Sequence, residues 1–114
     1  MNKLRNHVQL IGRLGTDLEL KQLDNGKAFT SISIATNDFY KDKDGNSVQN
    51  TEWHRAVAWG KTAENFCKIC KKGDEVALEG KLSHRKFDTP DGETKYITEV
   101  VVNEFALMNS KEVK

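Results

Sequence analysis

Apolar and polar residues alternate along most of the chain, as in His7, Val8, Gln9 and Leu10. Alternation with a period of two places successive side chains on opposite faces of a β-strand, so that one face is buried and the other is solvated. The chain is therefore predicted to be mostly β. The pattern predicts strands over residues 8–14, 28–37, 51–60, 76–82 and 96–107, with residues 18–23 as a continuation of the first strand or a short partner.

Turn signals separate these strands. Asn25 and Gly26 form a pair that tolerates the positive φ angles of a tight hairpin, and residues 89–92 turn the chain before the last strand. Residues 38–50 are polar and charged, which predicts a long protruding loop or hairpin.

The period changes once, between the third and fourth strands. Ala63, Phe66 and Cys70 recur at helical spacing, and Gly73 follows as a C-terminal stop. One helix is predicted over about residues 62–72.

Five antiparallel strands with a single helix between the third and fourth are the element order of the OB-fold, a small Greek-key barrel. The 114 residues are enough for one domain, predicted over residues 1–108, with residues 109–114 as a flexible C-terminal extension. Other small barrels share this strand count, so the fold alone leaves the function open.

Composition indicates where the protein is found. No apolar run approaches the roughly 20 residues of a membrane span, and the first residues lack the apolar region of a signal peptide. We expect a cytoplasmic protein without membrane contact, in which Cys67 and Cys70 stay reduced. The net charge of +1 is uninformative by itself, but residues 1–16 contain three cations and no acid, which predicts a basic surface on one side.

Residues 51–60 are the most informative segment. Alternation places Trp53, Arg55, Val57 and Trp59 on one face. The other face carries small alanines that suit the interior of a narrow barrel, so the tryptophan face is predicted to be the outer one. Large exposed aromatic surface normally marks a binding site. The alternative is that both tryptophans belong to the core.

Aromatic residues occur next to cations at several strand ends and loops. Single-strand binding needs flat rings on which unpaired bases stack and cations near the phosphates. These pairings are Phe39 and Tyr40 with Lys41 and Lys43, Trp59 with Lys61, and Arg85 and Lys86 with Phe87. A surface cation more often serves only solvation, so the pairing matters more than the count.

Other chemistry finds little support. Cys67 and Cys70 have the spacing of a zinc or redox pair, but no second cysteine pair exists and core packing explains them better. Glutamates 79, 99 and 104 lack a ligand spacing and are expected on solvated faces or in salt bridges. Neither the three histidines nor any glycine-rich loop forms a catalytic or phosphate-binding motif. We expect no enzyme activity, no metal and no cofactor.

Four segments resemble the bacterial single-stranded DNA-binding family in order and spacing. They are residues 8–15 (VQLIGRLG), 34–37 (IATN), 51–55 (TEWHR) with 59–61 (WGK), and 96–103 (YITEVVVN). The TEWHR segment followed by an aromatic residue, Gly and Lys is highly specific, whereas the Gly-x-Leu-Gly element is weak by itself. The resemblance implies a homotetramer of OB barrels around which single-stranded DNA wraps.

The resemblance also implies site residues. The stacking platforms would be Tyr40, Trp53, Trp59 and Phe87; at Tyr40 and Phe87 the family often has tryptophan, and at Trp59 phenylalanine. The phosphate contacts would be Lys3, Arg5, Arg13, Lys43, Arg55, Lys61, Lys72, Arg85 and Lys86.

These observations predict a protein that coats single-stranded DNA in replication, repair and recombination. The runner-up is an OB-fold RNA binder or a protein-interaction module of replication restart, and a small β-barrel enzyme is a further alternative. The family commonly continues into an acidic tail that recruits partner proteins, whereas this sequence ends at Lys114. Either the tail was removed or this is a tailless relative, so partner recruitment is not assigned to these residues.

Overall fold

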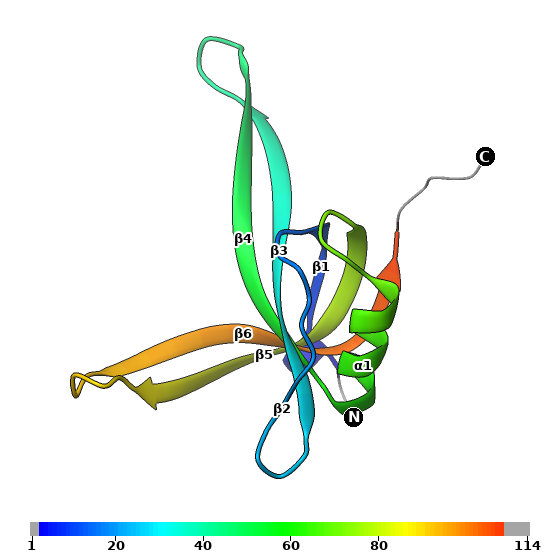
Figure 1. Ribbon diagram of the computed structural model, residues 1–114. Helices are drawn as coiled ribbons and strands as arrows, with labels where there is room; N and C mark the ends of the chain where they lie inside the picture. Colours follow the sequence, from blue (N-terminus) through cyan, green and yellow to red (C-terminus); the bar gives the residue numbers. More distant parts are fainter. Residues whose placement is uncertain (1–2, 109–114) are drawn as a thin grey trace.

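The computed structural model describes residues 3–108; the predicted extension over residues 109–114 lies outside the described residues, as do residues 1–2. The fold is a closed barrel of five long strands with a short sixth strand and one α-helix (Figure 1). In chain order the elements are η1 (Lys3–Arg5), β1 (Val8–Leu14), β2 (Lys21–Gln22), β3 (Ala28–Lys41), β4 (Ser47–Trp59), α1 (Gly60–Ile69), β5 (Glu75–Asp88) and β6 (Thr94–Leu107).

Strand pairing confirms the OB-fold prediction. The sheet has the order β1-β5-β6-β4-β3-β2, and pairing of β1 with β3 closes it into a barrel. All pairs are antiparallel except β4 with β6, which run parallel where Ala56 and Val57 lie opposite Val100 and Val101. At the closure, Gly12 is required because a Cβ atom there would overlap with the carbonyl of Ala35.

The helix lies between the predicted strands, but its bounds differ from the predicted residues 62–72. It begins at Gly60, directly after the last residue of β4, because Gly60 adopts a φ of 60° that turns the chain from strand into helix. It ends at Ile69, because Cys70 is already extended although its N–H still bonds to the Phe66 carbonyl at 3.0 Å. Gly73 therefore belongs to the turn after the helix.

Four strands, β3 to β6, extend further than their predicted bounds. Residues 38–50 form the end of a hairpin, since β3 and β4 stay paired up to Lys41 and Ser47. The fourth predicted strand, residues 76–82, continues to Asp88 and pairs with β6 up to Thr94. Of residues 18–23, only Lys21–Gln22 form a strand, which pairs with the start of β3. These residues thus form a short separate strand, but its partner is β3 rather than the first strand, β1.

The core fills the barrel and its end under α1. Ala63 and Phe66 of α1 are fully buried, and Phe66 packs on Phe105 of β6 with ring centroids 4.4 Å apart. The remaining core residues come from inward-facing strand positions, including Ile34 and Leu78. The helix therefore closes the barrel by presenting one apolar stripe to it.

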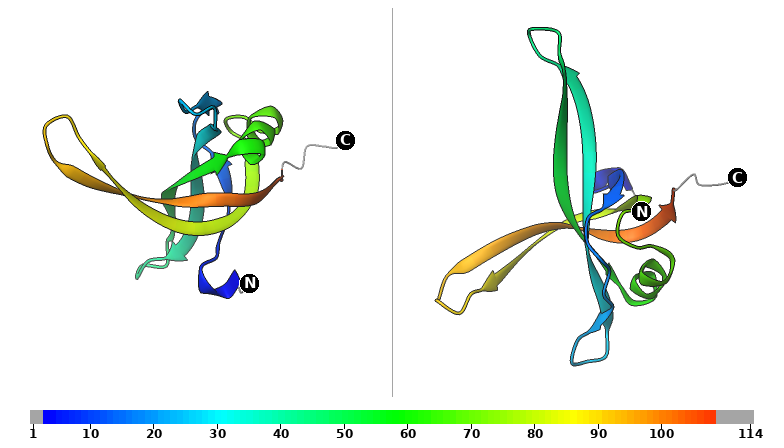
Figure 2. Two further views of the ribbon diagram at one scale, coloured as in Figure 1. Left: turned by 90° about the horizontal axis from the view of Figure 1, so that it is seen from below. Right: turned by 45° about the horizontal axis from the view of Figure 1, so that its top comes forward.

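Two hairpin arms leave the barrel in different directions. The β3–β4 arm and the β5–β6 arm diverge, and α1 lies on the side of the barrel away from the β5–β6 arm (Figures 1 and 2). Within residues 3–108, no helix is long and apolar enough to cross a membrane. The arms carry most of the aromatic residues considered below.

Candidate nucleic-acid interface

The outer face of β4 carries Trp53 and Arg55, as the alternation predicts. Trp53 is 61% exposed, whereas Ala56 and Ala58, on the opposite face, are fully buried inside the barrel. The alternative of a core position is therefore wrong for Trp53. Val57 differs from its neighbours on the outer face because it is buried, at the point where β4 pairs with both β3 and β6.

Small residues surround the Trp53 ring. Across the strands Trp53 lies opposite Ala35, and its six-membered ring contacts Gly15, where a Cβ atom would overlap with Cζ3 and Cη2. The indole can therefore lie close to the barrel surface while most of its area stays open to solvent. This arrangement provides a flat ring of the kind on which an unpaired base stacks.

A groove of about 410 Å³ lies beside Trp53. Its lining comes from Thr16, from β3 and from β4 and includes the hydroxyl residues Ser31 and Ser33 and the guanidinium residue Arg55. A ring, hydroxyl groups and a cation are thus brought together in one open depression. Such groups can contact a base and its phosphate at the same time.

Trp59 is only half-buried and already has two neighbours. Its ring centroid lies 5.2 Å from that of Phe29 in a tilted arrangement. The Nζ atom of Lys27 lies over the ring, 4.9 Å from the centroid, at the distance of a cation–π contact. Trp59 therefore offers less free ring surface than Trp53. Lys61, the cation paired with Trp59 in the sequence, is exposed in α1.

The end of the β3–β4 arm carries exposed rings and a cation. Tyr40 is exposed near the end of β3. Lys43 is exposed in the turn between the strands, where Asp42 Oδ1 accepts hydrogen bonds from the backbone N–H groups of Asp44 and Asn46 at 2.9 Å. The Asp42 side chain thus stabilises the turn and positions Lys43 at its tip.

The β5–β6 arm carries aromatic residues and cations on both faces. Phe87 lies opposite Lys95, and Lys86 lies opposite Tyr96. Because adjacent residues of a strand point to opposite faces, each face of this arm presents one ring beside one cation. Phe87 and Lys86, which the sequence pairs, lie on the same arm but point to opposite sides of it. The cation beside Phe87 on its own face is Lys95.

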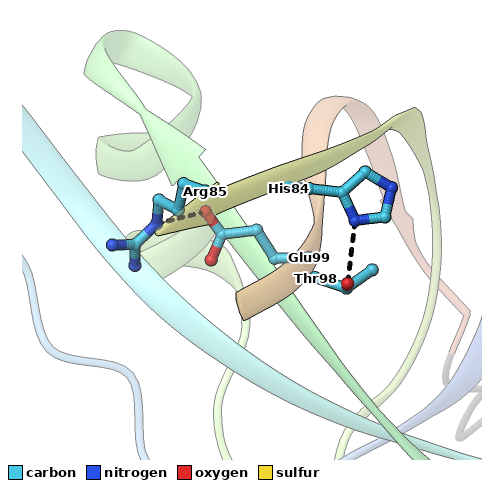
Figure 3. Close-up of polar contacts among 4 residues, drawn as sticks. All are labelled: His84, Arg85, Thr98 and Glu99. Atoms are coloured by element: carbon cyan, nitrogen blue, oxygen red, sulfur yellow. Dashed lines mark hydrogen bonds and ion pairs between the residues drawn. The ribbon is translucent and has the colours of Figure 1, made fainter. Parts of the chain in front are cut away.

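Arg85 forms an ion pair within the same arm. Its Nε atom donates to Glu99 Oε2 at 3.0 Å, and Glu99 is only 6% exposed (Figure 3). In Figure 3 the two terminal nitrogens of Arg85 point away from this carboxylate. One residue earlier, His84 Nδ1 and Thr98 Oγ1 form a hydrogen bond of 2.9 Å. Arg85 thus compensates a buried charge and still presents donors to solvent.

Other predicted phosphate contacts lie elsewhere on the barrel. Arg13 Nη1 donates to the Gly73 carbonyl at 3.1 Å, which brings Arg13 next to exposed Lys72. Arg5 is exposed in η1, near the start of β1. The side chain of Lys3 lies outside the described residues. The predicted residues therefore form no single cluster but surround the barrel and both arms.

Two exposed rings were not among the predicted stacking platforms, although the sequence places Phe39 beside Tyr40 in one of the ring–cation pairings. Phe39 is 68% exposed and Tyr96 is 73% exposed. For Phe39 the available signal was Asp44-Gly45, a typical hairpin turn pair; with that turn, residues 38–41 become part of a strand whose faces can be assigned. For Tyr96 the signal was a neighbouring cation, as for the other rings. That cation is Lys86 of β5, which is distant in sequence.

The cysteines and histidines have structural surroundings. Cys70 is buried, and burial, followed by the charges of Asp74 and Cys67, raises the pKa of its thiol to about 11. His54 bonds to Thr36 at 2.9 Å, and His7 bonds to Glu79 at 2.9 Å. Across residues 3–108, no three His, Cys, Asp or Glu side chains are grouped so that they could hold a metal ion.

A second depression, of about 250 Å³, lies over β1, β5 and β6. Its lining includes Glu79 and Glu104. Two carboxylates would repel a phosphate backbone, so this depression suits nucleic acid less well than the groove beside Trp53.

Comparison with known proteins places this arrangement in a family. The model of the single-strand binding protein family matches residues 5–108. Single-stranded DNA-binding protein 1 of Chlorobaculum tepidum is 40% identical over 108 residues, which are 94% of this chain and 67% of that protein. The single-stranded DNA-binding protein of Xanthomonas axonopodis pv. citri is 41% identical over 106 residues, which are 93% of this chain and 59% of that protein. The chain thus spans about three fifths to two thirds of these relatives.

Solved structures agree with this match. The Plasmodium falciparum SSB in a complex with ssDNA superposes with a TM-score of 0.81 at 30% identity, over 91% of this chain and 95% of that one. A deletion mutant of the single-stranded DNA-binding protein from Thermus aquaticus has the same fold, with a TM-score of 0.80 at 24% identity over 93% of this chain and 51% of that one. The chain belongs to the single-strand binding protein family.

Proposed function

We propose that this protein binds and coats single-stranded DNA without strong sequence preference. The observation that carries the proposal is the groove beside Trp53, where an exposed indole, hydroxyl groups and Arg55 line one depression. Relatives named single-stranded DNA-binding proteins support it, as does the Plasmodium falciparum structure, which is a complex with ssDNA.

Binding combines stacking with phosphate contacts. Every base has a π-face, so stacking on an aromatic side chain contributes roughly 1–3 kcal/mol per base with little sequence preference. We assign stacking to four platforms on β3, β4 and β5, namely Tyr40, Trp53, Trp59 and Phe87. We assign phosphate contacts to the cations around them: Lys3, Arg5, Arg13, Lys43, Arg55, Lys61, Lys72, Arg85 and Lys86.

The role is one of binding rather than catalysis. The protein keeps strands unpaired and protected during DNA replication, repair and recombination, in the cytoplasm and in contact with the nucleoid. The chemistry of these processes belongs to other proteins that act on the coated strand.

We propose a homotetramer as the assembly. On the side facing β3, β1 is paired only at Arg13 and Leu14, so the stretch from Val8 to Ile11 leaves backbone groups open along one edge. An open strand edge is a template for pairing with another chain, and Ile11 is an exposed apolar side chain on this strand. Native mass spectrometry at micromolar protein should give the mass of four chains, and an Ile11→Lys substitution should shift it toward fewer.

Titration with oligo(dT) tests the binding function. Stacking on Trp53 and Trp59 should quench tryptophan fluorescence strongly, and the affinity should fall as salt rises because phosphate contacts release counterions. Duplex DNA of the same length should compete weakly. Absence of quenching by oligo(dT) would refute DNA binding, and tighter binding of oligo(U) would favour an RNA binder instead.

A further inference from the structure

The face of the β3–β4 arm that carries Trp53 continues to the end of the hairpin. Pairing between β3 and β4 is continuous from Phe29 with Trp59 to Lys41 with Ser47. Without a bulge, alternation is maintained, so Ala35 opposite Trp53, and then Asn37, Phe39 and Lys41, point to the same side. Tyr40 points to the opposite side. Phe39, at 68% exposed, is therefore the next ring on the Trp53 face.

A hydrogen-bonded polar cluster lies between these two rings. Thr51 Oγ1 donates to Asn37 Oδ1 at 2.7 Å, and Gln49 Nε2 donates to Asn37 Oδ1 at 3.2 Å and to Thr51 Oγ1 at 3.3 Å. The three side chains therefore fix one another on the Trp53 face. No partner is found within residues 3–108 for Asn37 Nδ2 or Gln49 Oε1, which leaves one donor and one acceptor open.

The spacing suits a single strand. Ala35, opposite Trp53, and Phe39 are four residues apart on β3, which is about 13 Å at the rise of a β-strand. A stacked strand advances about 3.4 Å along its axis per nucleotide, so the two rings are separated by no more than about four nucleotides. Gln49 lies directly opposite Phe39, which places its amide beside a base stacked on that ring.

We propose that Phe39 is a further stacking platform and that the amides of Asn37 and Gln49 contact the edge of the base held there. This inference rests on the proposed binding of single-stranded DNA. Each of the four bases presents an acceptor beside a donor on its Watson–Crick edge, so an open amide donor and amide acceptor suit any unpaired base. Lys41, at the end of the same face, supplies a cation for the phosphate.

The first experiment removes or replaces the ring. Phe39→Ala should weaken binding of oligo(dT) by about 5- to 100-fold, the range expected for the loss of one stacked base. The loss should appear only with oligonucleotides long enough to reach from Trp53 to Phe39. Phe39→Trp should retain affinity and should increase the fluorescence quenched on binding, since the new indole reports on its own position.

The second experiment separates the amide contacts from stacking. Asn37→Ala and Gln49→Ala should each weaken binding of an intact oligonucleotide a few-fold, with a smaller effect on a strand in which abasic sites replace the bases. Asn65→Ala is the matched control, because Asn65 is an exposed amide in α1, outside the proposed site, and should bind like the wild type.

The outcomes distinguish this inference from the proposed function. If wild-type protein fails to bind oligo(dT), the proposed function fails as well. If wild-type protein binds and Phe39→Ala binds equally tightly at every length, the Phe39 site alone is overturned. A change in assembly mass for Phe39→Ala, with unchanged DNA affinity, would assign the ring to a contact between copies and would also overturn it.

Discussion

Gly15 lies against the indole of Trp53, and a Cβ atom at Gly15 would occupy the space of the ring atoms Cζ3 and Cη2. We expect Gly15→Ala to displace the indole from the barrel surface and to weaken binding of oligo(dT), measured by fluorescence titration. The effect should act through the ring. In a Trp53→Ala background the glycine substitution should therefore cause no further loss, because the two residues share one contact. Equal losses in both backgrounds would contradict this coupling.

Trp53 and Trp59 should respond differently to truncation. Trp53→Ala removes an exposed ring, so it should lower DNA affinity by about 5- to 100-fold while the free energy of unfolding changes by about 0.5 kcal/mol or less. Trp59 packs on Phe29 and beneath Lys27. Trp59→Ala should therefore also lower the free energy of unfolding, by about 1–3 kcal/mol. Urea denaturation of the two variants, compared with their DNA titrations, separates the roles, and similar losses of stability would contradict the assignment.

Arg85 should contribute to stability as well as to binding. Arg85→Ala leaves the buried carboxylate of Glu99 without its charged partner, which should lower the free energy of unfolding by about 1–3 kcal/mol. Glu99→Gln should restore part of this loss in the double variant, since it removes the unpaired charge. Lys86→Ala, at the next position of the same arm, is the control and should leave stability unchanged. A double variant no more stable than Arg85→Ala would show that the ion pair is not the cause.

Arg55 should determine part of the salt dependence. For single strands, each phosphate contact contributes about 0.7 to the slope of log affinity against log salt. Arg55→Gln should therefore reduce the slope for oligo(dT) by about 0.7 in magnitude. Lys68→Gln, on the exposed side of α1, removes an equal charge outside the proposed site and should leave the slope nearly unchanged.

Cys70 should react more slowly than Cys67. Burial raises the pKa of the Cys70 thiol to about 11, so at pH 8 the protein should be alkylated first at Cys67, as read by peptide mass spectrometry. The protonated thiol is favoured by folding, so the associated stability is present below pH 9 and is lost as pH rises from about 9 toward 11. A Cys70→Ser variant should show a smaller decline over this pH range. Faster labelling of Cys70 than of Cys67 would contradict its burial.

Hydrophobic alternation predicted the strands of the barrel, but not the length of the two hairpin arms. Period-two alternation located β1 correctly because every second residue of that strand faces the core. Beyond Asn37 both faces of the β3–β4 arm are solvated, so the hydrophobic signal disappears although the backbone pairing continues. For the same reason, alternation did not predict residues 83–88 as part of β5. Hydrophobic alternation reflects burial of one face of a strand, so it is absent where a strand extends beyond the core.

The site was predictable where it touches the barrel. The alternation around Trp53 assigned its face because Ala56 and Ala58 fill the interior. The position of Phe39 depended on the register that the Asp44-Gly45 turn gives the β3–β4 hairpin, which hydrophobic alternation alone does not define. The partner of Arg85 depended on which residues of β6 lie across from β5. Such relationships arise from strand pairing between distant segments, which a single sequence does not specify.

The parallel seam between β4 and β6 consists of two residue pairs, Ala56 with Val100 and Val57 with Val101. This short seam joins the hairpin that carries Trp53 and Phe39 to the hairpin that carries Phe87. Because the two hairpins diverge from this seam, we expect a strand of DNA that contacts both to change direction there. Substitutions at Val57 or Val101 would therefore alter the number of nucleotides occluded per protein, even though neither side chain needs to touch a base.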